Sequence, residues 1–408
     1  MRTVFVNHCH PDTPHVCALR MTSFAVAMAA RGHQVVLLTE PLDPDDDGQD
    51  LGSLADDLIH HDWAAPYSLP IKPLHNDALS KLRAGQLPGG LRQLTIARHY
   101  LFNSGLFGDW RIGASPYLKI LAKHFQPDVI WASFGNTDVW NIAKDLSSKA
   151  GCPWVADIKD NWTAFLPYGF AQLIANRFKG AAHMTAFSKA HQAEAKRWFN
   201  TEPSVIYSGF DQTQVEADVV QNGRCILLTG SVYDDRQAAE LINGIATWAR
   251  AGNADGLEVR YAGADAERMK TLIAPLEGAC DIIIDGFLDL TRLRALQAGA
   301  WVNAYMHSPR SLFQHKPLEL LAAGRPVLAF PDESAEVKEI AREVGGTLST
   351  CSTANDVIAF LNSLDRDNSV SLKSDHMNKY SWQSQAEVLE RVLEATGQTS
   401  GQSSGQTS

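Results

Sequence analysis

The strongest constraint on the fold is an alternation of short apolar runs with amphipathic helical patterns. Residues 2–7 and 34–39 (QVVLLT) have the pattern of buried strands, and residues 17–31 between them have apolar positions at helical spacing. Gly32 follows where such a helix is expected to end. A strand, a helix and a second strand in immediate succession form a βαβ unit, which predicts a parallel sheet.

The same alternation continues along the chain in two series. The first series has expected strands at 129–133, 153–158, 182–186 and 204–207, and expected helices at 138–149 and 189–199. The second series has expected strands at 225–229, 257–262, 282–284, 301–304 and 327–330, and expected helices at 237–251 and 317–323. The break between the series predicts an α/β chain with two Rossmann-like, doubly wound domains facing a cleft.

These patterns set the expected domain boundaries. We expect an N-terminal domain at 1–212 and a C-terminal domain at 213–380. Residues 381–396 have apolar side chains on one helical stripe and predict an amphipathic helix. Residues 397–408 (GQTSGQSSGQTS) repeat a polar unit that cannot build a core, so we expect a disordered polar tail there.

Length and composition agree with two globular domains. The chain has 408 residues, of which 45% are apolar and 20% charged. Lys plus Arg is 36 and Asp plus Glu is 46, and the formal net charge of −10 argues against a nucleic-acid partner. No apolar stretch approaches the length of a membrane span, and residues 1–12 have the pattern of a strand rather than a signal peptide. We therefore expect a cytoplasmic protein whose six scattered cysteines are reduced.

Two polar clusters resemble metal sites without having the required pattern. Residues 43–47 form an acidic run inside the polar, irregular stretch 42–91, which we interpret as a solvated loop. His8, His10 and His15 lie near the end of the first strand, but neither they nor the cysteines have metal-ligand spacing. For these histidines, a role in proton transfer or acceptor binding and a place in a plain polar loop both stay open. We predict no metal site and no bound cofactor.

The segment 313–330 (FQHKPLELLAAGRPVLAF) is the strongest candidate for a binding site. A short loop delivers Lys316 near a helix start, and Glu319 lies in the first turns of that helix. Gly324 ends the helix, and Pro326 opens the next strand. Open α/β sheets bind ligands beyond the carboxyl ends of their strands, where such a carboxylate can accept both hydroxyls of a ribose. The alternative is that Glu319 is a surface residue favoured by the helix dipole.

This segment resembles the donor-binding element of GT-B glycosyltransferases, in particular family 4. In that element a Lys, a Glu and a Gly-x-Pro-Val turn follow in the same spacing, and the Glu binds the ribose of the donor. The matching positions here are Lys316, Glu319, Gly324, Pro326 and Val327. Many family members have a further Glu upstream that contacts the transferred sugar, and this chain has Ser311 at that position.

The N-terminal half carries two further resemblances, so that the order of elements matches over residues 1–396. Residues 151–165 (GCPWVADIKDNWTAF) resemble a strand end in the same enzymes, and Asp160 falls at the mouth of their interdomain cleft. Residues 204–211 (SVIYSGFD) resemble the element that closes their N-terminal domain, with Ser208 in place of an Asn.

The C-terminal half opens with a segment that resembles the first strand and phosphate loop of these enzymes. This segment is 227–236 (LLTGSVYDDR), and Arg236 matches one of the two basic residues usual there. The resemblance implies a catalytic or acceptor-side role for Asp160. It implies donor binding by Gly230, Ser231, Arg236, Ser311, Lys316 and Glu319.

The resemblance implies a retaining glycosyltransferase that uses a UDP-, GDP- or similar sugar donor. The implied acceptor is a saccharide or a lipid-linked molecule, as in surface polysaccharide synthesis, with peripheral association at the cytoplasmic face of the membrane. We interpret the acidic run 43–47 as a loop, and no DxD-type metal motif is evident, so we expect metal-independent transfer. Two alternatives are a sugar-nucleotide 2-epimerase of the same fold and a non-catalytic protein that binds nucleotide sugars.

Overall fold

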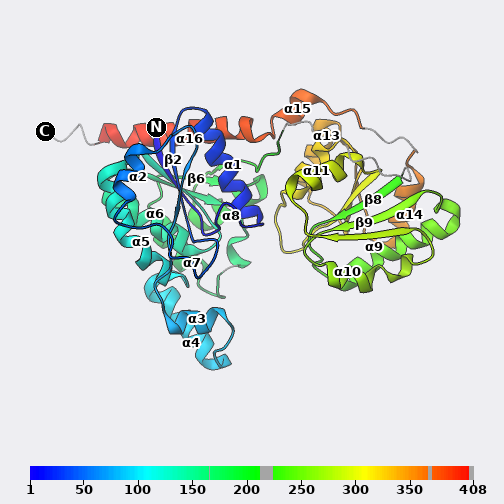
Figure 1. The fold of residues 1–408 in the computed structure, drawn as a ribbon, viewed down its shortest axis with the longest axis horizontal. Helices are drawn as coiled ribbons and strands as arrows, with labels where there is room; N and C mark the ends of the chain where they lie inside the picture. The colour runs from blue at the N-terminus through cyan, green and yellow to red at the C-terminus, as the bar shows by residue number, and fades with distance from the viewer. Residues whose placement is uncertain (165, 212–223, 366–369, 404–408) are drawn as a thin grey trace. The chain divides into compact units, whose positions relative to one another are not determined.

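The chain forms two compact units, each built on one parallel sheet. The computed structural model describes residues 1–164, 166–211, 224–365 and 370–403. Unit 1 is Met1–Ser208 together with the segment from Trp382 onward, and unit 2 is Gly209–Ser381. Figure 1 shows helices packed around the sheet of each unit. The predicted α/β class with two Rossmann-like sheets is therefore confirmed.

The sheet of unit 1 has seven strands among the described residues, in the order β3-β2-β1-β4-β5-β6-β7. These are β1 (Arg2–Val6), β2 (Gln34–Thr39), β3 (Tyr67–Pro70), β4 (Val129–Ser133), β5 (Trp154–Ile158), β6 (His183–Ala186) and β7 (Ser204–Val205). Every neighbouring pair is parallel. This is the Rossmann order, and its direction reverses between β1 and β4.

Helices cover the two faces of this sheet. The helices of unit 1 are α1 (Val16–Ala30), α2 (Leu54–His60), α3 (Asp77–Arg83), α4 (Gly89–Asn103), α5 (Gly108–Ile120), α6 (Thr137–Ala150), α7 (Ala171–Phe178), α8 (Lys189–Phe199) and α16 (Trp382–Ser403). One apolar core includes side chains of α2, α5 and α6. A second core is formed by side chains of α1 and α16 and includes Phe24 and Trp131.

Helix α16 belongs to unit 1 and extends past the predicted helix end. Its buried Leu389 and Leu393 pack with α1, and Arg31 pairs with Glu390 beside them. The helix continues to Ser403, so the prediction of a disordered tail is wrong for residues 397–403. Once packing has fixed the earlier turns, each added residue gains a hydrogen bond at little further cost. Residues 404–408 lie outside the described residues.

The prediction of an irregular loop over 42–91 is wrong for much of that stretch. The acidic run 43–47 is an exposed loop as expected, but α2, β3 and α3 follow it. Leu54 and Leu58 of α2 are buried one turn apart, and β3 buries Leu69 at the sheet edge. Such short elements bury too few side chains to produce a clear periodic pattern.

The sheet of unit 2 has six strands among the described residues, in the order β10-β9-β8-β11-β12-β13. The strands are β8 (Arg224–Thr229), β9 (Leu257–Ala262), β10 (Asp281–Gly286), β11 (Val302–Met306), β12 (Val327–Phe330) and β13 (Leu348–Thr350). The helices are α9 (Asp235–Trp248), α10 (Ala266–Leu272), α11 (Leu290–Gly299), α12 (Lys316–Ala322), α13 (Ala335–Val344), α14 (Ala354–Asn362) and α15 (Ser374–Asn378). All pairs are again parallel, and the order reverses between β8 and β11.

The end of the continuous part of unit 1 is held by a buried ion pair. Arg20 of α1 donates two hydrogen bonds to Asp157 of β5, at 3.0 and 3.2 Å. It also donates to the Ile206 carbonyl at 3.0 Å and to the Ser208 hydroxyl at 3.2 Å. The continuous part of unit 1 ends at Ser208, whereas the predicted boundary at 212/213 lies outside the described residues.

No helix among the described residues is both long and apolar enough to span a membrane.

Candidate functional site

Two loops meet at the switch point of unit 2, at the carboxyl ends of β8 and β11. The Gln314 amide of the β11–α12 loop donates to the Tyr233 hydroxyl of the β8–α9 loop at 3.2 Å. The Lys316 Cε atom would lie 3.7 Å from a Cβ placed on Gly230. Because open α/β sheets bind ligands at such a switch point, this is the candidate site of unit 2.

The turn after β8 is rigidly held by its neighbours. The Tyr261 hydroxyl of β9 donates to the Gly230 carbonyl at 2.7 Å. The Asp265 carboxylate accepts from the Val232 N–H at 2.9 Å, and the Asp265 N–H donates to the Tyr261 hydroxyl at 3.2 Å. Gly230 has φ +99°, a conformation that favours glycine. The backbone of this turn is thus presented in a fixed orientation next to Lys316.

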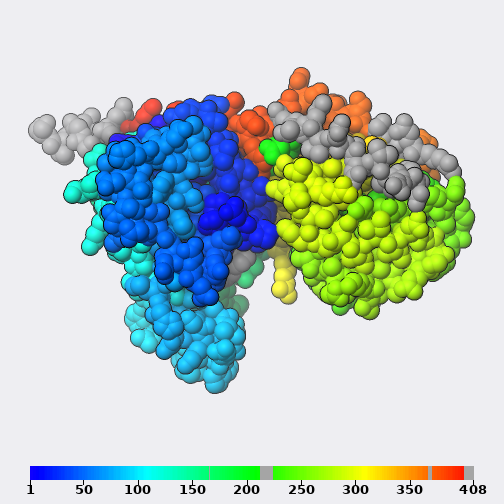
Figure 2. Space-filling model, in the orientation of Figure 1, coloured from blue at the N-terminus to red at the C-terminus, as the bar shows by residue number. Residues whose placement is uncertain are grey.

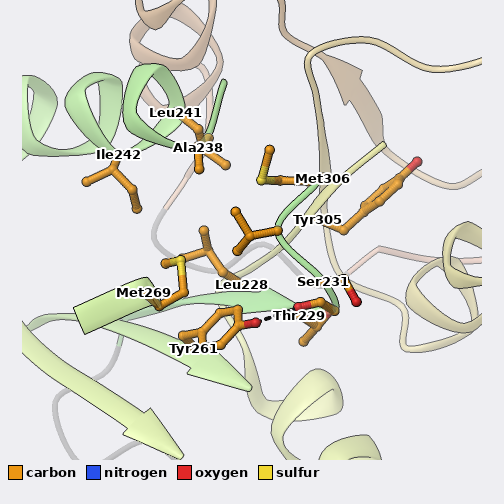
Figure 3. A pocket seen from close by; sticks show the side chains of 12 residues that line it. Leu228, Thr229, Ser231, Ala238, Leu241, Ile242, Tyr261, Met269, Tyr305 and Met306 are labelled. Carbon is orange, nitrogen blue, oxygen red and sulfur yellow. Dashed lines mark hydrogen bonds between the residues drawn. The ribbon is translucent and has the colours of Figure 1, made fainter. Parts of the chain in front are cut away.

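An apolar pocket lies beneath the turn, between β8 and α9 (Figure 3). Its lining comprises Leu228, Thr229, Gly230, Ser231, Val232, Ala238, Leu241, Ile242, Tyr261, Met269, Tyr305 and Met306. Most of these side chains belong to the core of unit 2. The pocket therefore supports the turn rather than offering polar contacts to a charged ligand.

Gly230→Ala should lower both stability and nucleotide binding. The added Cβ meets Lys316 at ordinary contact distance, so the main cost is the left-handed backbone, about 1–2 kcal/mol of unfolding free energy. Gly252 has the same φ of +99° away from the site and is the matched control. In denaturant titrations both variants should lose similar stability, and in calorimetry only Gly230→Ala should bind nucleotides more weakly. Equal nucleotide affinity in the two variants would contradict this role of the turn.

The start of α12 surrounds one carboxylate with positive charge. The Glu319 side chain is 13% exposed, with one oxygen 3.6 Å from the Lys316 Nζ and the other 3.7 Å from the His315 Nδ1. The His315 Nε2 donates to the Gly209 carbonyl at 2.6 Å, which fixes the ring. Burial raises the pKa of Glu319, but His315, Lys316 and Arg294 outweigh burial and hold the pKa below its usual 4.5. Glu319 is therefore an ionised hydrogen-bond acceptor at neutral pH.

Two arginines near the site belong to no sequence motif, and the sequence analysis missed them. Arg294 of α11 contributes to the positive potential at Glu319 and pairs with Asp211 at 2.8 Å. Arg268 of α10 donates to the Val232 carbonyl and pairs with Asp235 at 2.5 Å. Both come from helices whose sequences show only ordinary surface charge, so only the fold brings them to these loops.

The other predicted donor residues lie around the same loops without joining Lys316 and Glu319. Ser231 is exposed in the turn, and Arg236 is exposed in the first turn of α9. Within the described part of the chain Arg236 makes no ion pair. Ser311 lies in the β11–α12 loop, where its N–H donates to the Ser308 carbonyl at 3.0 Å. The structure thus brings together Gly230, Lys316 and Glu319 from the predicted set.

Asp160 follows β5 in unit 1 and pairs with its neighbour. Its carboxylate accepts from the Lys159 Nζ at 2.6 Å, and this lysine is buried. Burial raises the pKa of Asp160, and the charge of Lys159 opposes that effect. The next short helical turn is capped by Asn161, which accepts from the Thr163 N–H at 3.1 Å. Asp160 is therefore not that cap, and its carboxylate is held by an ion pair.

Ligand-type side chains also gather at the end of β1, although their spacing predicted no metal site. Cys9, His15 and Cys17 place their ligand atoms within 4.8 Å of one another. His8 adjoins them, with Nε2 3.2 Å from the Cys9 Sγ. His10 instead accepts from the Asp12 N–H at 3.2 Å.

The fold is shared with solved structures of low sequence identity. No protein-family model matches this chain, and no curated protein matches its sequence. HepE of Anabaena, solved with UDP and glucose, is 14% identical over 99% of both chains, with a TM-score of 0.56. A glycosyltransferase from Rickettsia africae is 11% identical over 97% of this chain and 98% of its own, with a TM-score of 0.62. The chain has the GT-B fold.

A third GT-B structure shows that this fold is not tied to one reaction. A Listeria monocytogenes protein, provisionally assigned as a UDP-N-acetylglucosamine 2-epimerase, is 12% identical over 97% of this chain and 96% of its own, with a TM-score of 0.58. Function must therefore be argued from the site rather than from the GT-B fold. In this GT-B chain Lys316 and Glu319 lie at the switch point of unit 2, and Asp160 ends β5 of unit 1.

Proposed function

We propose that this chain is a glycosyltransferase that moves a sugar, with retention, from a nucleotide-sugar donor bound by unit 2. The observation that carries the proposal is the meeting of Gly230, Lys316 and the ionised Glu319 at one switch point. A flexible cation over a backbone turn suits a diphosphate, and a nearly buried carboxylate suits the two hydroxyls of a ribose. A nucleoside diphosphate carries both groups on one molecule.

The proposed transfer makes negative charge on the leaving group. The bond from the anomeric carbon to the diphosphate breaks, that carbon bonds to an acceptor hydroxyl oxygen, and the hydroxyl proton passes to the departing diphosphate. Lys316 would stabilise the growing charge of the diphosphate, with Arg236 as a second cation from the first turn of α9. Protein cations take this role in the proposal, so donor binding needs no divalent ion.

Calorimetry with nucleotides in EDTA tests donor binding directly. UDP is the first probe, because HepE was solved with UDP and glucose. GDP, ADP, CMP and dTDP follow as competitors. We expect one nucleotide to bind with an affinity that EDTA leaves unchanged. If none of these nucleotides binds, the proposal is refuted.

Lys316→Ala should weaken the binding of UDP far more than that of uridine. The lost charge-assisted hydrogen bonds to phosphate are worth about 1.5–3 kcal/mol, which is at least tenfold in affinity. Uridine lacks the phosphates, so its affinity should stay within about twofold. Lys270→Ala changes an exposed lysine of the same unit and serves as the control. Equal losses for UDP and uridine would show that Lys316 does not contact phosphate.

The acceptor and the stereochemistry require turnover assays. We propose a saccharide or lipid-linked acceptor, as in surface polysaccharide synthesis in the cytoplasm. The sugar nucleotide that binds best would be incubated with a panel of such acceptors. The anomeric configuration of the product, read by NMR, should match that of the donor. An inverted product would refute the retaining assignment.

A 2-epimerase is the second candidate, because the Listeria monocytogenes protein of the same fold is provisionally assigned to that reaction. An epimerase would act on the sugar nucleotide without an acceptor. Incubation of the donor alone should therefore give no epimer if the chain is a transferase. Tight nucleotide binding without any turnover would instead indicate a non-catalytic binding protein.

A further inference from the structure

The loop after β1 and the first turn of α1 bring three soft metal ligands together in unit 1. Cys9 lies in the loop, His15 is the N-cap residue of α1, and Cys17 follows in its first turn. The two Sγ atoms and one ring nitrogen of His15 all lie within 4.8 Å of one another. The blue N-terminal part of the chain reaches the surface of unit 1 in Figure 2, and His15 is exposed.

The spacing of these atoms suits a tetrahedral ion. With Zn–S near 2.3 Å and Zn–N near 2.0–2.1 Å, tetrahedral ligand atoms are about 3.5–3.8 Å apart. The Cys9 Sγ lies 3.8 Å from the His15 Nδ1. The same nitrogen accepts from the Cys17 N–H at 3.2 Å, so an ion bound there would replace this cap bond. Two thiols and an imidazole bind zinc in preference to the harder magnesium and calcium ions.

The surroundings stabilise deprotonated sulfur at Cys17. The buried Lys159 donates from Nζ to the Cys17 Sγ at 2.7 Å and to the Asp160 carboxylate at 2.6 Å. Two thiolates would balance a divalent cation, and Lys159 would balance Asp160, so the filled cluster would be neutral. Hydrogen bonds to ligating sulfur from such neighbours orient the ligands of metal sites.

A disulfide between the two cysteines fits these contacts less well. It would use only the sulfur atoms and would leave His15 with the single role of capping α1, where its Nδ1 accepts from the Cys17 N–H. It would also remove the negative charge that the Lys159 ammonium faces at the Cys17 Sγ.

We propose that Cys9, His15 and Cys17 bind one zinc ion in unit 1. The described residues supply three ligands in this group, so the fourth position is open to water or to an oxygen of a bound molecule. Three protein ligands with one open position are the arrangement of catalytic rather than structural zinc sites. The inference does not depend on the proposed glycosyl transfer, because the donor elements lie in unit 2.

Titration of the reduced, full-length chain with Co²⁺ tests the site without an activity assay. Co²⁺ bound to thiolates gives sulfur-to-metal absorption in the near ultraviolet and the visible bands of a tetrahedral ion. We expect these bands to saturate at one equivalent and to disappear on addition of Zn²⁺, which thiolate sites bind more tightly. UDP affinity should be the same with and without the metal.

Three variants test the assignment of the ligands. Cys9→Ser removes a half-buried ligand, and His15→Asn removes the imidazole while keeping a good helix cap. Each should weaken Co²⁺ binding at least tenfold, because the loss of even a residue that only orients a ligand typically costs ten- to a hundredfold in metal affinity. Cys152→Ser removes another half-buried cysteine of unit 1 and should bind as the unchanged chain does. Circular dichroism and melting curves check that each variant is folded.

Other outcomes would overturn the proposal. The reduced chain could show no sulfur-to-cobalt absorption, or the absorption could persist in Cys9→Ser and His15→Asn. Recovery of a Cys9–Cys17 disulfide by mass spectrometry, with no Co²⁺ binding after reduction, would replace the metal site by a redox pair.

Discussion

Glu319→Gln should raise the Kd for UDP about ten- to a hundredfold while the chain stays folded. The carboxylate is 13% exposed and ionised between His315 and Lys316. In the proposed complex it accepts hydrogen bonds from the ribose, and such bonds to a charged group are worth about 1.5–3 kcal/mol. Calorimetry with UDP measures the change. Glu267→Gln alters an exposed glutamate in the first turn of another helix of unit 2 and should leave the Kd unchanged.

A double-mutant cycle with the ligand makes this test specific to the ribose. The unchanged chain should bind 2′-deoxy-UDP more weakly than UDP, because one hydroxyl is missing. That difference should shrink in Glu319→Gln if the carboxylate contacts the hydroxyl. A difference that persists in full would place Glu319 away from the ribose, whatever its effect on overall affinity.

Asp160→Asn should lower kcat about a hundredfold and leave the Kd for UDP nearly unchanged. The proposed role of Asp160 lies on the acceptor side, and the donor elements lie in unit 2. A group whose contacts form mainly in the transition state affects kcat and kcat/KM together, and such groups typically contribute a hundredfold or more. Steady-state kinetics with a donor and an active acceptor measure this split.

The ion pair with Lys159 offers a structural explanation for a loss of activity in Asp160→Asn. This explanation must be separated from a role of Asp160 in catalysis. The Asp160 side chain is 29% exposed and Lys159 is buried. Removing the carboxylate should cost up to about 3–5 kcal/mol of stability, because the lysine charge stays buried. Melting curves of Asp160→Asn measure that cost. Asp160→Glu keeps the charge but moves it, so it should recover stability and not turnover. Near-normal kcat with a lowered Tm in Asp160→Asn would make Asp160 a structural residue.

The sequence predicted the elements in which apolar side chains recur in a regular pattern over a long enough stretch. The apolar runs of β1, β2, β5 and β8 and the helix α1 lie within a residue or two of their predicted bounds. Strand β3 and helix α2 were missed, because each buries only one or two large apolar side chains amid polar residues. The extension of α16 to Ser403 could not be predicted, since its repeated polar residues carry no apolar stripe.

The candidate site was predictable only as far as it follows from strand ends and one motif. The resemblance to GT-B donor-binding elements assigned Lys316, Glu319 and Gly230 to one site, and the structure places Lys316 beside Gly230. Both loops follow strand ends, where open α/β sheets bind ligands. Arg294 and Arg268 reach these loops from other helices and have no distinguishing pattern. Cys9 meets Cys17 only because the loop between them folds back onto the start of α1.

The place of α16 in unit 1 sets an order in which the protein can be completed on the ribosome. Unit 2 is continuous in the chain, whereas unit 1 needs residues from both sides of it. Until Trp382, Leu389 and Leu393 have been synthesised, the apolar surface around Phe24 and Trp131 has no cover. The unit that starts first is therefore finished last, and during synthesis its open face is exposed to aggregation and to chaperones while unit 2 can already fold.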